Sequence, residues 1–353
     1  MIDFSLFFFS NYQVDANDKY SLLLKCAKFS DQHGFSAVWT PERHFHEFGG
    51  LYPNPSVVSA ALATITKNIE LRCGSIVSPL HDAIRIAEEW SVVDNLSHGR
   101  ISLSFASGWN GNDFVLAPDA YADRHALMLE QINTVKHLWA GGKTKRKNGL
   151  GEEIEVGVYP APIQQDIPIW ITAAGNERTF IDAGKRGFNV LTHLLGQEIG
   201  SLKTKIEKYR EARAAHGHDP ATGKVAVMLH TFVGEQLSEV ERVVEEPFIN
   251  YLRSATSLSK FLYEKEGLDP DQIPEADKEI MLHRSYMRYS KTSALIGTVR
   301  TCRPMIKRLA AIGVNEIACL VDFGIPESTV VENLKHLGNL AESVSLQEAA
   351  ILN

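Results

Sequence analysis

The chain has little cysteine and none of the common metal or nucleotide motifs. Its four cysteines are not spaced as C-x-x-C pairs, which argues against a disulfide framework or a structural zinc site. Three of them lie in apolar runs, so we expect buried thiols in a reducing compartment and predict a cytoplasmic protein. The absence of H-E-x-x-H, G-x-G-x-x-G, Walker-type and G-x-S-x-G sequences disfavours zinc proteases, dinucleotide-binding folds, P-loop enzymes and serine hydrolases.

Excess positive charge and long apolar runs are also absent. The formal net charge is -7 and the pI is near 6.0, whereas a nucleic-acid-binding surface needs a basic face. The apolar N-terminal run 1–9 has no basic lead and is too short to cross a membrane. We therefore expect no nucleic-acid or membrane partner, and interpret this run as a buried strand.

Strand-like and helix-like patterns alternate along most of the 353 residues. Such alternation predicts parallel strands with right-handed crossovers, and eight strands are the number that closes a (β/α)8 TIM barrel. An open doubly wound sheet is the competing fold, but it usually has a glycine-rich loop after its first strand, and Ser10-Asn11-Tyr12-Gln13 contains no glycine. The expected strands are 2–9, 37–40, 70–77, 101–106, 167–172, 188–192, 225–233 and 314–321, and the closing helix is 328–341.

One long segment interrupts this alternation. Residues 234–293 follow the seventh strand, and insertions of this length in barrels tend to be lids or binding elements. A purely structural helical pair is the alternative, and the pattern does not separate the two. We expect one domain over 1–353, with this insertion and a C-terminal tail over about 344–353.

Polar side chains gather just after the expected strands. The richest group, Thr40 to Gly50, contains two histidines, an arginine and two glutamates directly after the second strand. In a (β/α)8 barrel the active site lies at the carboxyl ends of the strands, so these groups should meet at one rim able to hold a large polar cofactor. Similar groups follow the other strands: Ser78, Ser107 to Asn110, Gly175, Asn176, Arg178, His193, His230, Thr231 and Asp322.

Two local patterns allow more than one interpretation. Ala174 to Thr179 leads into a helix, whose N-terminus suits a phosphate, although capping by Asn176 alone is the commoner use of such a motif. His44 and His46 are two residues apart, but no further ligand spacing supports a metal, so we expect none. A glycosidase pair involving Glu42 requires a carboxylate separation that sequence does not give.

Several ordered motifs together resemble the bacterial luciferase-like flavin-dependent monooxygenases. The similarity is greatest to the branch found in polyketide and nonribosomal peptide biosynthesis, and it extends over nearly the whole chain. The motifs that carry it are PERHFH at 41–46, YPNP at 52–55, LSFASGWN at 103–110, AAGNERTF at 173–180 and VLTHLLGQ at 190–197.

The resemblance implies a barrel that binds reduced flavin mononucleotide (FMN). Reduced flavin reacts with O2 to form a C4a-(hydro)peroxide, which transfers one oxygen atom to a substrate. The resemblance places His44 beside the reactive edge of the flavin, as a hydrogen-bonding or proton-donating group. It also implies a non-proline cis peptide at Gly74-Ser75. It assigns the flavin ring and phosphate to Ala106, Ser107, Gly108, Trp109, Gly175, Asn176, Thr179 and His193, with charge added by Arg124 or His125.

Arg43 departs from the luciferase pattern, in which a catalytic histidine occupies this position. An arginine cannot act as a general base near neutral pH, so neither the luciferase base mechanism nor light emission is transferred. We expect Arg43 either to hold an anionic group of the substrate or flavin, or to pair with Glu42 or Glu47.

The resemblance further implies partners and a substrate class. It predicts a separate reductase that supplies reduced FMN, an acyl or aminoacyl substrate that is free or carrier-bound, and a homodimer. A deazaflavin- or flavin-dependent dehydrogenase and a non-catalytic flavin-binding subunit are the alternatives within the same fold.

Overall fold

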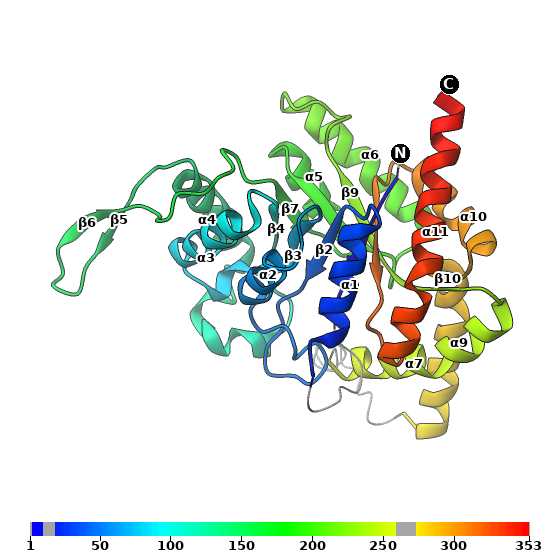
Figure 1. The fold of residues 1–353 in the computed structure, drawn as a ribbon. Coiled ribbons are helices and arrows are strands. Elements are labelled where there is room, and N and C mark those ends of the chain that lie inside the picture. The colour runs from blue at the N-terminus through cyan, green and yellow to red at the C-terminus, as the bar shows by residue number, and fades with distance from the viewer. Residues whose placement is uncertain (1, 10–17, 259–272, 353) are drawn as a thin grey trace.

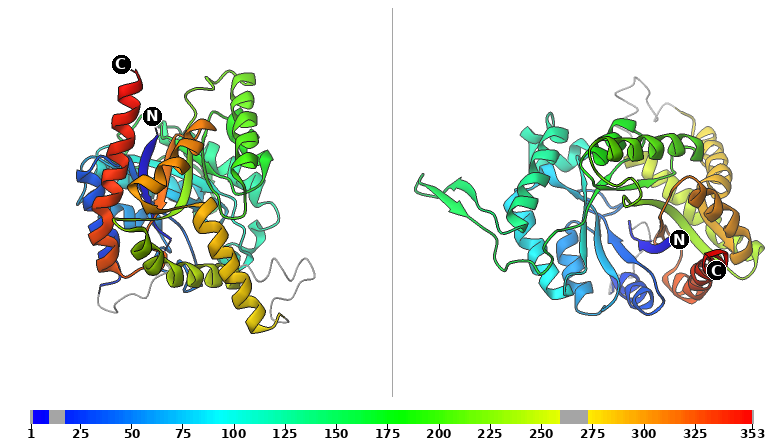
Figure 2. Two further views of the ribbon diagram at one scale, coloured as in Figure 1. Left: turned by 90° about the vertical axis from the view of Figure 1, so that its right-hand side faces the viewer. Right: turned by 90° about the horizontal axis from the view of Figure 1, so that it is seen from above.

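Eight parallel strands close into a barrel, as the alternating pattern predicts. The computed structural model describes residues 2–9, 18–258 and 273–352. Around the barrel each strand pairs with the next and the last with the first, and Figure 2 shows the ring from above. In spatial order the strands are β1 (Asp3–Phe7), β2 (Ala37–Thr40), β3 (Glu70–Val77), β4 (Ile101–Ala106), β7 (Ile169–Thr172), β8 (Asn189–His193), β9 (Val225–Gly234) and β11 (Glu316–Leu320).

Helices cover the outside of the barrel. Several begin where the sequence offers a cap: the side chains of Asn54, Asp82 and Thr298 accept hydrogen bonds from the first turns of α2, α3 and α10. Their buried faces pack on the strands and join the barrel interior in one large apolar core. These helices are α1 (Ser21–Gln32), α2 (Pro55–Ala63), α3 (Ala83–Ser97), α4 (Arg124–Trp139), α5 (Glu177–Lys185), α6 (Ile199–Ala215), α10 (Val299–Ala311) and α11 (Glu327–Leu352).

Three strands lie outside the predicted set. β10 (Ala294–Thr298) pairs in parallel with the outer half of β9, where β8 has already ended. β5 (Thr144–Lys147) and β6 (Glu153–Val156) form an antiparallel hairpin that projects from the body in Figure 1. The hairpin strands are charged and exposed, so neither carries the apolar signature of a buried strand. β10 begins with an apolar run but has only five residues, one of them a glycine.

The insertion after β9 is helical where the structure describes it. α7 (Leu237–Leu258) and α9 (Glu275–Thr292) pack on each other and on β10, and residues 259–272 lie outside the described part. Figure 1 shows this pair at the lower end of the view, opposite the N-terminus. From α7, Phe248 and Tyr251 pack against the ring of His230 in β9, with centroids 4.5 and 4.3 Å away. The insertion therefore covers the rim beside β9.

The closing helix is longer than its sequence pattern suggests. α11 continues to Leu352, so the segment from 344, expected as a tail, is helical up to that residue. The buried series Leu337, Leu340 and Val344 keeps helical spacing past Ala341, which explains the extension. Residues 10–17, which follow β1 and include the glycine-free Ser10 to Gln13, lie outside the described residues.

Two further expectations concern burial. All four cysteines are free and buried, as their apolar surroundings predict. Among the described residues, no helix combines the length and apolar character needed to cross a membrane.

Candidate active site

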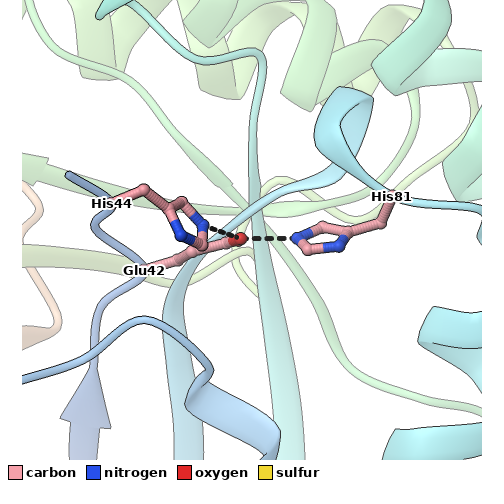
Figure 3. A group of neighbouring side chains, drawn as sticks. All are labelled: Glu42, His44 and His81. Carbon is pink, nitrogen blue, oxygen red and sulfur yellow. Dashed lines mark hydrogen bonds and ion pairs between the residues drawn. The ribbon is translucent and has the colours of Figure 1, made fainter. Parts of the chain in front are cut away.

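The carboxylate of Glu42, just after β2, is the centre of a hydrogen-bonded group at the barrel mouth. Its Oε1 lies 2.8 Å from Nε2 of His44 and 2.5 Å from Nε2 of His81, while its Oε2 accepts the N–H of Val77 at 2.7 Å. Figure 3 shows the two imidazoles on opposite sides of the carboxylate. Burial opposes ionisation of Glu42, but these hydrogen bonds outweigh it and hold the pKa of the carboxyl below its usual value.

His81 is a site residue that the sequence motifs missed. It follows the short turn Ser78–Leu80 at the end of β3, a position that the strand-end rule covers but for which only Ser78 was considered. Burial lowers its basicity, yet the hydrogen bond to Glu42 raises the pKa of His81 above its usual value. Its backbone carbonyl accepts a 2.7 Å hydrogen bond from Gln131 of α4, which fixes its place.

Arg43 is buried and pairs with neither glutamate proposed for it. Its Nη1 lies 3.3 Å from Oδ2 of Asp113, and its guanidinium lies over the rings of Trp109 and Phe9 at 5.1 and 5.5 Å. The prediction of a pair with Glu42 or Glu47 is therefore wrong: the backbone turns the side chain toward the loop after β4. Nε of Arg43 is buried without a hydrogen-bond partner, so one donor is left for a ligand.

The loop after β4 forms a second side of the mouth. Gly108 has a φ of 79°, and a Cβ there would come within 2.8 Å of both Phe114 and Val77, so only glycine fits. Arg124, which opens α4, donates from Nε to the carbonyl of Gly108 at 3.0 Å. Ala106, Ser107 and Gly108 are half-buried and Trp109 is 40% exposed, so this loop presents accessible surface at the rim.

The Gly74-Ser75 peptide is cis, as the resemblance implies. A Cβ at Gly74 would lie 2.9 Å from Trp39 and 3.0 Å from Phe7, so the packed barrel interior requires glycine here. The Ser75 hydroxyl is hydrogen-bonded to that of Thr172, which also lies 2.8 Å from the hydroxyl of Ser104. Three neighbouring strands thus present hydroxyl groups below the mouth.

The start of α5 supplies groups suited to an anion. Asn176 caps the helix by accepting from the N–H of Arg178 at 2.9 Å, so the capping interpretation is confirmed. A Cβ on Gly175 would meet nothing within 4 Å, and Gly175 and Asn176 are exposed, with Thr179 half-buried. Burial and the nearby positive charges of Arg124 and Arg178 lower the pKa of His125. Arg124, Arg178 and His125 thus bring cationic groups to the start of this helix, next to the acidic Glu177 of its first turn.

The last predicted site residue, His193, ends β8 close to His230 of β9. Burial, reinforced by the neighbouring His193, lowers the pKa of His230 to about 3, and burial also lowers the pKa of His193. Nδ1 of His193 and Nε2 of His230 are both buried without a hydrogen-bond partner. Neutral imidazoles with free nitrogens can bind uncharged donors or acceptors of a ligand.

The strand order brings all the predicted site residues to one end of the barrel. The buried unpartnered groups of Arg43, His193 and His230 and the open, cationic start of α5 fit a ligand that is polar along its length and anionic at one end. FMN has this chemistry, so the residues present fit that cofactor.

Comparisons with known proteins agree with this geometry. A family model described as luciferase-like monooxygenase matches residues 2–316. The oxygenase component of a flavin-dependent trigonelline monooxygenase from Acinetobacter baylyi is 26% identical over 87% of this chain and 84% of its own. An alkanal monooxygenase alpha chain from a Kryptophanaron alfredi symbiont is 23% identical over 92% of each chain.

Solved structures share the fold. A monooxygenase from Streptomyces bottropensis superposes with a TM-score of 0.79 at 20% identity, over 96% of this chain and 98% of its own. The oxygenating constituent of 3,6-diketocamphane monooxygenase from Pseudomonas putida, a type II Baeyer-Villiger enzyme in complex with FMN, gives 0.75 at 18% identity over the same shares.

Proposed function

Because the chain belongs to the luciferase-like monooxygenase family, we propose that its barrel mouth binds reduced FMN and that it transfers one oxygen atom from O2 to an organic substrate. The observation that carries this proposal is the arrangement at the mouth: a buried Glu42 carboxylate holds His44 there, in the same rim as the cationic start of α5. When bound, reduced flavin supplies the two electrons that activate O2.

Different residues of the chain would bind the phosphate and the ring of FMN. The exposed start of α5, with the side chains of Thr179, Arg178 and His125, would hold the phosphate, and Arg124 would support the loop at Gly108. The surface of Ala106 to Trp109 and the region of Gly74 and Ser75 would line the ring.

His44 is the group best placed to move a proton. Since ionised Glu42 can only accept hydrogen bonds, Nε2 of His44 must donate to it, which leaves Nδ1 as the nitrogen that takes or gives a proton at the mouth. Arg43 keeps its charge at all working pH values and is balanced by Asp113, so its role would be to position a ligand through Nε.

The substrate and partners form the finer part of the proposal. We propose an acyl or aminoacyl substrate from natural-product biosynthesis, a separate reductase that supplies reduced FMN, a homodimer and a cytoplasmic location. The reductase is supported by the relative named as the oxygenase component of a flavin-dependent monooxygenase. Carrier-bound and free substrates are distinguished by comparing pantetheine thioesters with the corresponding free acids.

The proposal is tested by mixing the protein, loaded anaerobically with reduced FMN, with oxygenated buffer. We expect the return of oxidised-flavin absorbance to lag behind O2 consumption, and label from ¹⁸O2 to enter one product of an acyl thioester panel. A dehydrogenase would oxidise a substrate without incorporating label. Reoxidation at the rate of free reduced FMN, with no labelled product, would identify a non-catalytic flavin-binding subunit.

A further inference from the structure

A small cavity lies behind the Glu42 carboxylate, outside the barrel wall. It has a volume of about 40 Å³ and is lined by Glu42, His81 and residues of α2 and α3, which is room for about three water molecules. The His81 side chain is 32% exposed, whereas that of His44 is 10% exposed and that of Glu42 only 1%. His81 is thus the member of the group with access to solvent.

The hydrogen bonds fix which ring nitrogens carry protons. Both imidazoles direct Nε2 at the same oxygen, Oε1 of Glu42, and the other oxygen is occupied by the N–H of Val77. An ionised carboxylate only accepts, so both Nε2 atoms donate and both Nδ1 atoms are free to gain or lose a proton. His44 and His81 lie on opposite sides of the carboxylate (Figure 3), and His81 lines the outer cavity.

The single buried negative charge of Glu42 balances one extra proton, and either of the two imidazoles can carry that proton. If both histidines were doubly protonated, the buried group would carry a net positive charge in a site of low polarity, which is costly. A proton gained at one ring is therefore offset by a proton lost at the other, as in other coupled pairs of titrating groups.

We propose that Glu42 couples His44 at the mouth to His81 at the outer cavity, so that His81 is the solvent-side proton donor and acceptor of the site. When His44 takes a proton at Nδ1 from a reacting group, His81 releases its Nδ1 proton to solvent. When His44 gives a proton to the mouth, His81 takes one up. Glu42 stays ionised and both Nε2–H hydrogen bonds persist, so the group returns to the same net charge after each exchange.

This inference goes beyond the proposed function, because His81 acts through Glu42 as a positioning residue and touches no cofactor. Its use in turnover rests on the proposed function, whereas the coupling itself does not. It would let the mouth stay closed to water while protons exchange on the far side of β2 and β3, which protects a water-sensitive reaction.

Other charged groups also face the pair. Arg85 and Glu89 of α3 line the outer cavity beside His81. Burial lowers the pKa of His81, the hydrogen bond and charge of Glu42 raise it, and the charge of Glu89 raises it further. On the inner side, Asp113 lies near enough to be affected by His44. These groups are the same in His81→Gln and in the wild type. A change in the behaviour of His44 in the variant therefore reports the loss of His81.

The experiment is a histidine NMR titration of the full-length protein without flavin. In the wild type we expect the ring signals of His44 to respond when His81 takes up a proton, because both rings donate to the same oxygen of Glu42. In His81→Gln, which keeps a donor toward Glu42 but cannot be protonated, we expect that response to disappear. The matched control is His283→Gln, since that exposed imidazole of α9 lies 3.5 Å from Glu245.

A pH response of the His44 ring signals that is the same in folded His81→Gln and in the wild type would overturn the coupling. If the variant does not fold, His81→Asn and a titration of the wild type in D2O still report whether the two rings share one transition. With flavin and substrate present, the pH optimum of kcat should shift in His81→Gln and added imidazole should restore the rate. Coupling without such rescue would contradict the role in turnover, and a lack of any turnover in the wild type would contradict only the proposed function.

Discussion

Arg72 lies in the barrel interior below the mouth, in a setting that ordinarily disfavours charge. Its guanidinium lies over the rings of both Trp39 and Trp170, at 4.8 and 4.9 Å, and Nη1 donates to Glu316 at 2.7 Å. Ser5 and the indole of Trp39 donate to the same carboxylate. The buried charges are thus paired and hydrogen-bonded from four strands, which ties β1, β2, β3 and β11 together.

Replacing Glu316 with glutamine should destabilise the protein strongly. The change removes the only fully buried carboxylate bonded to Arg72 among the described residues and leaves the half-exposed Glu70 as its countercharge. We expect the free energy of unfolding at neutral pH to fall by about 3 kcal/mol, as measured by denaturant titration. Burial raises the pKa of Glu316, but Arg72 and the hydrogen bonds outweigh this and hold it below its usual value. The stability it contributes is therefore present above about pH 4.3 and is lost as the pH falls through the lower, folded-state value.

The control uses the second carboxylate on the same arginine. Glu70 accepts from Nε of Arg72 at 2.8 Å but its side chain is 41% exposed, so Glu70→Gln should cost at most about 1 kcal/mol. Equal losses in the two variants, or a difference between wild type and Glu316→Gln that grows on acidification, would contradict the assignment.

At the level of residues, the sequence predicts where a side chain lies in the fold better than it predicts which side chains it contacts. The cis peptide at Gly74-Ser75 follows from the family resemblance, and the strand-end location of His44 follows from the motif at 41–46. The partners of Arg43 and Glu42 do not, because Asp113 and His81 lie 70 and 39 residues further along the chain. The parallel pairing of β2 with β3 and of β3 with β4 brings them within hydrogen-bond distance.

At the level of elements, burial decides what the sequence predicts. The eight barrel strands are buried and appear in the sequence as apolar runs, whereas β5 and β6 have the charged, exposed residues that are typical of loops. β10 has a buried face but only five residues, one of them Gly297. For the insertion 234–293, the sequence allows either a lid or binding element or a purely structural helical pair, because composition alone does not distinguish them. The structure shows helices over 237–258 and 275–292.

The β5–β6 hairpin should be dispensable for folding. Lys145 and Glu153 join its strands at 2.9 Å, but their side chains are 65% and 60% exposed, and such pairs contribute little. Replacing 144–156 with a short Gly-Ser linker should change the melting temperature by no more than about 1 °C, since loop length has a weak effect on stability. Differential scanning calorimetry checks this.

The control is Val158→Ala, at the base of the hairpin. Val158 is buried in the main core, so its truncation should cost about 1 to 2 kcal/mol and lower the melting temperature measurably. A drop of several degrees on removing the hairpin itself would show that it packs on a second copy or on the body.

At the scale of the whole molecule, cofactor binding should stabilise the entire barrel, because the proposed site draws on most of its strands. At an FMN concentration of 100 times Kd, linkage adds about 2.7 kcal/mol, which should raise the melting temperature by roughly 3 to 4 °C for a chain of this size. Riboflavin, which lacks the phosphate, should give a smaller shift at the same concentration.

Two arginines at opposite ends of α5 provide the test of where the phosphate binds. Arg178→Gln should weaken FMN binding about tenfold and remove most of the difference between FMN and riboflavin. Arg186→Gln, at the C-terminal end of the same helix, should leave it intact. Equal effects of the two variants would point away from the start of α5.

The pairing of β10 with β9 fixes where the helical insertion leaves and rejoins the wall. Gly234 ends β9, and Ala294 is in register with His230, so the two attachment points are only about 13 Å apart along one edge. No described residue between them belongs to the ring of eight strands, and Phe248 and Tyr251 of α7 pack on that ring at His230. Relatives could thus acquire new substrate preferences by replacing this single module, and a chimera joined at 234 and 294 is the natural starting point for redesigning selectivity.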